Sequence, residues 1–137
     1  MPERILLFIM LLEKLELEGS QMRILVADQR SKIRSALRLL LEQEPNQRVV
    51  GEAINLDSLM TMVSENHPDL VLLEWELTKR QSTEILLVLR KLIPGIKVVA
   101  LSGNPEVSSL ALETGADAFV CKCDSPERLL AAVSAIS

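Results

Sequence analysis

The feature that most constrains this chain is a regular alternation of short apolar runs with amphipathic segments from Met22 onward. Runs rich in Val, Ile, Leu and Ala, typical of strands, lie at residues 23–27, 48–51, 69–73, 96–101 and 118–121. Apolar residues at helical spacing follow each run, at residues 31–44, 57–66, 83–92, 105–114 and 126–136. Parallel strands need crossover connections, and the helices in these connections cover the sheet. The sequence therefore predicts an α/β fold, a doubly wound five-stranded parallel sheet with helices on both faces.

Length and composition fit a single domain of this kind. The chain has 137 residues, a net charge of −4 and 48 % hydrophobic residues, enough apolar material for a real core. A pI of about 5.1 provides no overall basic field, so we expect no direct binding to nucleic acid. Aromatic residues make up only 2 % of the chain, which excludes base-stacking platforms and leaves a core of aliphatic residues.

The two cysteines, Cys121 and Cys123, are separated by one residue. This spacing is poor for a structural disulfide, and the chain lacks the further Cys and His residues of a zinc site. We therefore predict reduced thiols in a cytoplasmic protein. Lys122, between them, would favour a thiolate and a redox-sensing role, an alternative that nothing else in the sequence supports. The single histidine, His67, is expected to be a solvated loop residue.

The first 21 residues require a separate interpretation. Residues 5–12 are all apolar, but this run is too short to span a bilayer, and no small-residue cleavage site follows it. Its apolar residues surround the helix on most sides, so an ordered helix here requires burial. One interpretation is an additional helix that packs on the domain or on a second copy of the chain. The other is that the natural start is Met22. Either way, the sequence predicts an extension over residues 1–21 and a domain over residues 22–137.

Polar residues follow four of the predicted strands. Asp28 and Gln29 follow the first strand, Glu74 the third, Ser102 the fourth and Lys122 the fifth. The carboxyl ends of parallel strands meet at one edge of the sheet, where ligand and reaction sites lie. The first strand is not followed by a glycine-rich phosphate loop, which disfavours a dinucleotide-binding fold.

At these positions the sequence resembles the receiver domain of bacterial two-component response regulators, from about Met22 to the C-terminus. The resemblance rests on five stretches, RILVAD (23–28), VVGEA (49–53), DLVLLE (69–74), VVALS (98–102) and GADAFVCK (115–122). It implies a flavodoxin-like sheet with strand order 2-1-3-4-5. It also implies a protein partner, whether a histidine kinase, an output protein or a second copy of the chain.

The resemblance assigns a role to each residue at the sheet edge. Glu74 lies where the family has its phosphoacceptor aspartate, and Asp28 with Gln29 occupies the acidic pair that holds Mg²⁺. Ser102 matches the switch hydroxyl that bonds the phosphoryl group, and Lys122 the lysine that pairs with the acceptor. Phe119 matches the aromatic switch residue, although an aromatic residue in a strand is equally compatible with simple core packing.

Two of these positions depart from the family pattern. Glu74 carries its carboxylate one methylene further out than aspartate, which misplaces it for in-line attack. Gln29 removes one charge from the Mg²⁺ site, so Asp28 and Glu74 would hold the metal weakly or not at all. We therefore expect no cofactor and no enzymatic activity. In this interpretation the domain is an interaction module without normal aspartyl phosphorylation, in which Glu74 is a partial phosphomimetic near Ser102 and Lys122.

Alternative functions follow from the same residues. The domain could be a phosphotransfer-competent, Mg²⁺-dependent receiver, a flavodoxin-like cofactor binder, or a decayed site in which Glu74 and Lys122 form only a salt bridge. Receivers commonly dimerise through the face formed by the fourth helix, fifth strand and fifth helix of the domain. The sequence predicts a weak homodimer through this face or through the N-terminal segment. Arg30, Arg34 and Arg38 recur on the first helix of the domain, where they could bind an acidic partner or form a solvated face.

Overall fold

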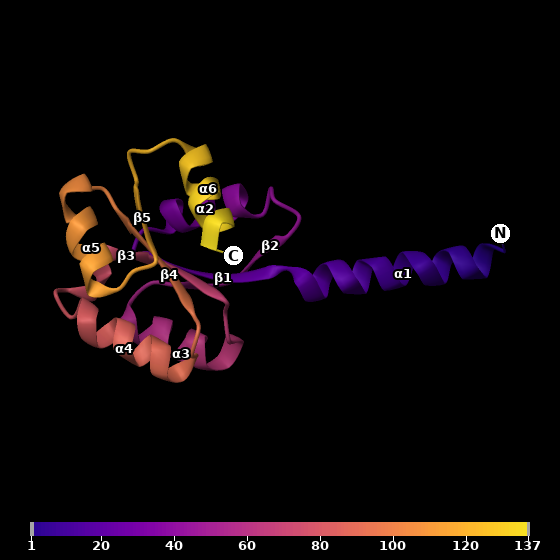
Figure 1. The fold of residues 1–137 in the computed structure, drawn as a ribbon, viewed down its shortest axis with the longest axis horizontal. Helices are drawn as coiled ribbons and strands as arrows, with labels where there is room; N and C mark the ends of the chain where they lie inside the picture. The colour runs from indigo at the N-terminus through magenta and orange to yellow at the C-terminus, as the bar shows by residue number, and fades with distance from the viewer. Residues whose placement is uncertain (1, 137) are drawn as a thin grey trace.

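A five-stranded parallel sheet forms the centre of the molecule (Figure 1). The computed structural model describes residues 2–136 and, among these, the side chains of all but residues 16–20. The strands are β1 (Met22–Ala27), β2 (Gln47–Ala53), β3 (Leu70–Glu74), β4 (Lys97–Ser102) and β5 (Ala118–Cys121). Their order is β2-β1-β3-β4-β5, and every neighbouring pair is parallel. This confirms the predicted flavodoxin-like topology.

Helices cover both faces of the sheet, as the sequence predicts. The helices α2 (Ser31–Leu41) and α6 (Pro126–Ile136) pack on one face. The other face is covered by α3 (Leu56–Asn66), α4 (Ser82–Leu92) and α5 (Ser108–Thr114). The carboxyl ends of the strands therefore lie between the two helical layers.

Alternate residues of the inner strands enter two separate cores. In β1, Leu25 packs in the core under α3 and α4, whereas Ile24 and Val26 pack in the core under α2 and α6. In β3, Val71 and Leu73 alternate in the same way with Leu70 and Leu72, and all four are at most 1 % exposed. A strand covered on both faces has no solvent side, which is why β3 is an uninterrupted apolar run.

The boundaries of several elements differ from the sequence prediction. The predicted helix over residues 105–114 begins as a short 3-10 turn, η2 (Pro105–Val107), and becomes α-helical only at Ser108. Its cap is Asn104, whose side chain accepts a hydrogen bond from the backbone N–H of Glu106. The predicted helix over residues 83–92 begins one residue earlier, at Ser82. Helix ends depend on a few local hydrogen bonds, so apolar spacing locates them only approximately.

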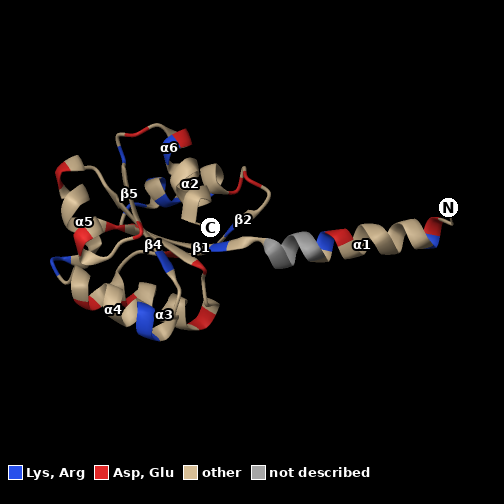
Figure 2. Cartoon of the chain, viewed as in Figure 1, with Lys and Arg blue, Asp and Glu red and all other residues tan. Residues whose placement is uncertain are grey.

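The N-terminal helix α1 (Glu3–Ser20) extends away from the domain (Figure 1). The predicted helix is confirmed, and of the two placements that the sequence left open, packing on its own domain is not the one seen here. Residues 5–12 and Leu15 are each at least 37 % exposed. Figure 2 shows an uncharged stretch along α1 between charged residues near its start and a second charged pair farther along the helix. The sequence identifies this second pair as Glu13 and Lys14. Within the described residues, no helix combines the length and apolar character needed to cross a membrane.

Candidate functional site

The polar residues predicted at the strand ends lie together at one edge of the sheet. The strand register places Ala27 of β1 beside Leu73 of β3, so the following residues, Asp28 and Glu74, are neighbours. Farther along the sheet, Ser102 at the end of β4 pairs with Cys121, which precedes Lys122. The parallel arrangement thus brings residues from four separate segments into one polar cluster.

Lys122 binds both carboxylates at the centre of this cluster. Its Nζ atom lies 2.8 Å from Oδ2 of Asp28 and 3.3 Å from Oε1 of Glu74. Asp28 is completely buried and Glu74 nearly so, whereas the Lys122 side chain retains 18 % of its exposure. One of the two buried negative charges is therefore offset by a cation that reaches both carboxylates from the surface.

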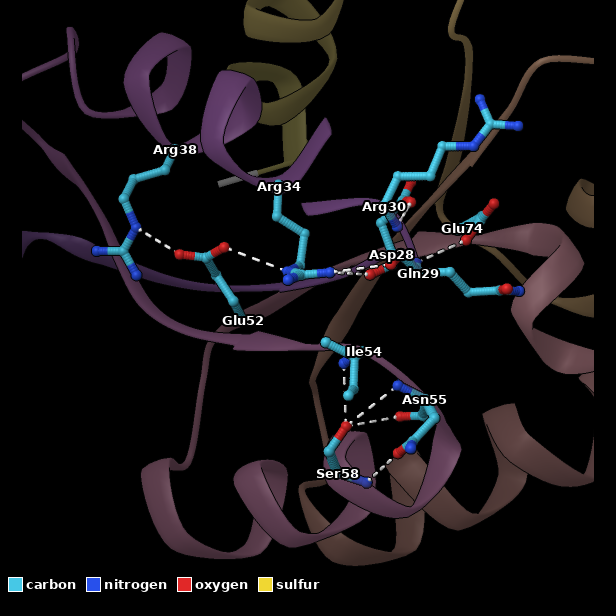
Figure 3. Close-up of polar contacts among 10 residues, drawn as sticks. All are labelled: Asp28, Gln29, Arg30, Arg34, Arg38, Glu52, Ile54, Asn55, Ser58 and Glu74. Carbon is cyan, nitrogen blue, oxygen red and sulfur yellow. Dashed lines mark hydrogen bonds and ion pairs between the residues drawn. The ribbon is translucent and has the colours of Figure 1, made fainter. Parts of the chain in front are cut away.

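Backbone groups satisfy the remaining carboxylate oxygens. Oδ1 of Asp28 accepts a hydrogen bond from the N–H of Arg30 at 2.8 Å, which fixes the turn that leads into α2. Oε2 of Glu74 accepts one from the N–H of Gln29 at 3.1 Å (Figure 3). Asp28 consequently acts both as a turn residue and as an ion-pair partner.

Ser102 does not take the partner expected from the sequence. Its hydroxyl donates to the carboxylate of Glu76 and accepts a hydrogen bond from the N–H of Asn104 at 3.0 Å. Glu76 lies on the 3-10 turn η1 (Trp75–Thr78), which follows β3 directly. Two glutamates therefore share the contacts expected of Glu74, which binds Lys122 while Glu76 binds the hydroxyl.

Glu76 is the site residue that sequence reasoning missed. Its signal is an acidic residue two positions after Glu74. The path of the chain depends on the 3-10 turn, whose Trp75 and Leu77 are buried and anchor it to the core. The apolar pattern does not specify such a turn, so the direction of the Glu76 side chain could not be predicted.

The arginines of α2 are engaged within the domain. Arg34 donates to the backbone carbonyl oxygens of Asp28 at 2.9 Å and Gln29 at 3.2 Å. Glu52 of β2 accepts from Nε of Arg34 at 3.3 Å and from Nε of Arg38 at 2.9 Å (Figure 3). The guanidinium groups of Arg34 and Arg38 therefore brace the site loop and β2 rather than forming a free basic stripe.

Phe119 lies on β5 beside Ala100 of β4. Its side chain is partly buried against the core under α3, α4 and α5. This packing explains the residue on structural grounds, and its role as a switch stays a prediction.

The residues present fit a Mg²⁺ ion poorly. Two buried carboxylates, Asp28 and Glu74, both contact the Lys122 ammonium, which already offsets one of their two negative charges. Gln29 contributes its backbone N–H to Glu74 and has no carboxylate to add. In the part of the chain that the structure describes, no group of three or more His, Cys, Asp or Glu residues is arranged to hold a metal.

The prediction of two reduced thiols is wrong in this structure. Cys121 and Cys123 are joined by a disulfide across Lys122. The short separation in sequence argued against a disulfide. The turn at the end of β5 nevertheless brings the two Cα atoms to 5.0 Å, a distance that a disulfide can bridge. The turn is closed by the N–H of Asp124, which donates to the carbonyl oxygen of Cys121 at 2.9 Å.

Sequence comparison relates the chain to one family of known proteins. The family model described as "Response regulator receiver domain" matches residues 24–134. The phosphate regulon transcriptional regulatory protein PhoB of Klebsiella pneumoniae is 36 % identical over 118 residues, covering 83 % of this chain and 51 % of that protein. The chain thus spans about half the length of this curated relative.

Solved structures agree with the fold. A LuxR-family two-component response regulator from Aurantimonas sp. SI85-9A1 has a TM-score of 0.76 and 26 % identity, with 85 % of each chain covered. A LuxR-family DNA-binding response regulator from Silicibacter pomeroyi has a TM-score of 0.71 and 31 % identity, covering 84 % of this chain and 90 % of that one.

Proposed function

The chain belongs to the response regulator receiver domain family, and we propose that it acts there as an interaction module that works without ordinary aspartyl phosphorylation. One observation carries the proposal. The groups that would contact a phosphoryl group in this family, Lys122 and the Ser102 hydroxyl, are already bound by Glu74 and Glu76. The signalling state is then set by the sequence rather than by a kinase.

The charge at the site supports this proposal. A phosphoryl group on a side chain carries about −1.5 to −2 at pH 7. Two ionised carboxylates carry about −2 together, and Glu74 and Glu76 hold them against the lysine and the hydroxyl. The pair would therefore supply constantly the contacts that phosphorylation supplies transiently.

The same geometry disfavours the phosphotransfer-competent alternative. Phosphoryl transfer depends on positioning and on charge neutralisation by a metal. Oε1 of Glu74 is directed to Lys122 and Oε2 to the N–H of Gln29, so both oxygens of the acceptor are engaged. The proposal accordingly includes no catalytic turnover and no Mg²⁺ requirement.

The proposed partners are proteins, and the proposed compartment is the cytoplasm. A histidine kinase, an output protein or a second copy of the chain would each recognise a receiver surface. Self-association could use the face formed by α5, β5 and α6, or helix α1. The exposed apolar side chains of residues 5–12 favour α1, because burying apolar surface away from water lowers the free energy of the assembly.

The flavodoxin-like alternative is less favoured. A hollow beside the site is lined by Gln29, Ile54, Asn55, Leu56, Asp57, Leu77, Lys79 and Gln81. None of these is aromatic, so the hollow offers no ring to stack on a flavin. A colourless preparation with no bound chromophore would agree with this assignment.

Intact-mass measurement after incubation with acetyl phosphate, with and without Mg²⁺, tests the proposal. We expect the wild-type chain to stay unmodified and the double variant Glu74→Asp, Gln29→Asp to gain one phosphoryl group when Mg²⁺ is present. The matched control is Glu76→Asp with Gln29→Asp, which shortens the neighbouring glutamate and should stay unmodified. Mg²⁺-dependent labelling of the wild-type chain would overturn the proposal in favour of a working phosphoacceptor.

A further inference from the structure

The geometry around Lys122 points to a thiol–disulfide exchange site, and we propose that Cys121 and Cys123 react with dithiol reductants. We also propose that their redox state controls how Lys122 is held at the acidic pocket. The proposal starts from the disulfide, which joins the residues on either side of Lys122. It does not depend on whether the domain accepts a phosphoryl group.

The two cysteine residues differ in exposure. Cys121 is the last residue of β5 and is 5 % exposed, whereas Cys123 lies in the following turn and is exposed. Thiol–disulfide exchange requires a thiolate to approach one sulfur directly, so access selects the atom that is attacked. Cys123 is therefore the electrophilic sulfur and Cys121 the leaving group.

The turn is arranged to stabilise the leaving thiolate. The backbone N–H of Cys123 donates to Sγ of Cys121 at 3.2 Å. The N–H of Cys121 donates to Oδ2 of Asp124 at 2.9 Å, which holds the base of the turn. A hydrogen bond from a backbone N–H to sulfur becomes stronger as the sulfur gains negative charge, so it favours cleavage toward Cys121.

The reaction balances with a dithiol as the second reactant. A thiolate of the reductant attacks Sγ of Cys123, the bond between the cysteines breaks, and a mixed disulfide forms while Cys121 departs as a thiolate. The second thiol of the reductant then attacks the reductant's first sulfur, which is bonded to Cys123 in the mixed disulfide, and Cys123 is released as a thiol. The protein gains two electrons and two protons, and the reductant becomes an intramolecular disulfide. Oxidised glutathione or another disulfide drives the reverse reaction.

The disulfide constrains the lysine at the centre of the site. The ring that it closes contains the whole backbone of Lys122, and the N–H of this residue also donates to the carbonyl oxygen of Ser102 at 2.8 Å. From this fixed backbone Nζ reaches Asp28 and Glu74. Reduction opens the ring, so Lys122 gains backbone freedom and its contacts with the two carboxylates weaken.

A ring this small favours a reactive role over a structural one. A disulfide stabilises a fold largely by restricting the unfolded chain, and the restriction is smallest when the joined residues are close in sequence. Cys121 and Cys123 are two positions apart, so the disulfide adds little to the stability of the fold. Disulfides in reducing compartments are mostly transient and redox-sensing, which fits the exchange reaction.

Alkylation followed by mass spectrometry tests the exchange site on the full chain. After treatment with oxidised glutathione we expect no reaction with iodoacetamide, and after dithiothreitol we expect two carbamidomethyl groups. The variants Cys121→Ser and Cys123→Ser each leave one thiol. The thiol of Cys121→Ser should form a mixed disulfide with glutathione at least tenfold faster than that of Cys123→Ser. Two free thiols after oxidation, or equal rates in the two variants, would overturn the exchange site.

Amide chemical shifts test the link to Lys122. We expect the backbone signals of Gln29 and Lys122 to move when dithiothreitol reduces the wild-type chain. The double variant Cys121→Ser, Cys123→Ser is the control, and its signals should not respond to the reductant. If the Gln29 signal stays in place when the wild-type disulfide opens, the cysteines exchange without affecting the acidic pocket, and that part of the proposal fails.

Discussion

The ammonium of Lys122 lies 2.8 Å from the carboxylate of Asp28, although β3 and β4 separate the strands that these residues follow, β5 and β1. The aspartate is completely buried, so this lysine is the cation that compensates its charge. A buried ion pair of this kind contributes little net stability compared with an apolar pair, but it is costly to break on one side only.

Replacement of Lys122 by Met should therefore destabilise the domain. The variant leaves Asp28 buried without its cation, and we expect the free energy of unfolding to fall by about 3 kcal/mol. Urea denaturation at neutral pH measures the change. Lys97→Met, at the exposed start of β4, is the matched control and should alter stability by less than about 0.5 kcal/mol.

The double variant Asp28→Asn, Lys122→Met separates the ion pair from simple loss of packing. Removing both charges should cost less than the sum of the two single changes, because Asp28 no longer leaves an uncompensated carboxylate and only Glu74 loses its cation. Additive losses would show that the two side chains stabilise the domain independently, contrary to the geometry.

Leu72→Ala tests the core of the central strand. This residue is 1 % exposed in β3 and packs under α2 and α6, so truncation leaves a cavity. We expect a loss of about 2 to 5 kcal/mol in the free energy of unfolding by urea. Leu39→Ala is the control, because Leu39 on α2 is 72 % exposed and should lose little. Similar losses in both variants would contradict the described packing.

Asn55→Ala should remove the cap of α3. Its side chain accepts from the N–H of Ser58 at 2.8 Å, while Oγ of Ser58 accepts from the N–H of Asn55 at 3.2 Å (Figure 3). Loss of such a capping box costs about 1 kcal/mol, measurable by thermal or urea unfolding. Thr61→Ala on the exposed side of the same helix lacks this role and serves as the comparison.

Helix α1 should control self-association. We expect the wild-type chain to sediment as an oligomer and the variant Leu7→Lys, Leu11→Lys to sediment as a monomer, since the charges prevent burial of that helix. Leu110→Lys changes an exposed leucine of α5 and tests the alternative face. Dissociation by Leu110→Lys alone would assign the interface to α5, and a monomeric wild-type chain would exclude both surfaces.

Much of the fold and part of the site could be predicted from the sequence. The all-apolar run of β3 requires cover on both faces, and its alternation with helical spacing leaves few other arrangements. The same alternation places Asp28, Glu74, Ser102 and Lys122 after successive strands, so their common edge followed from topology alone. A helix within residues 1–21 was one of the two interpretations of the sequence, because the apolar run over residues 5–12 favours it, and the structure gives its bounds as Glu3–Ser20.

Only the tertiary structure decided which of these groups touch. The strand order places residues at one edge of the sheet, within a few side-chain lengths of one another. Hydrogen bonds and ion pairs depend on differences of about 1 Å in the distance between two atoms, and local turns set these distances. The 3-10 turn after β3 directs Glu76 to Ser102, and the turn after β5 joins Cys121 to Cys123 around Lys122. The apolar pattern specifies strands and helices through burial, and it contains no comparable signal for the path of a polar turn.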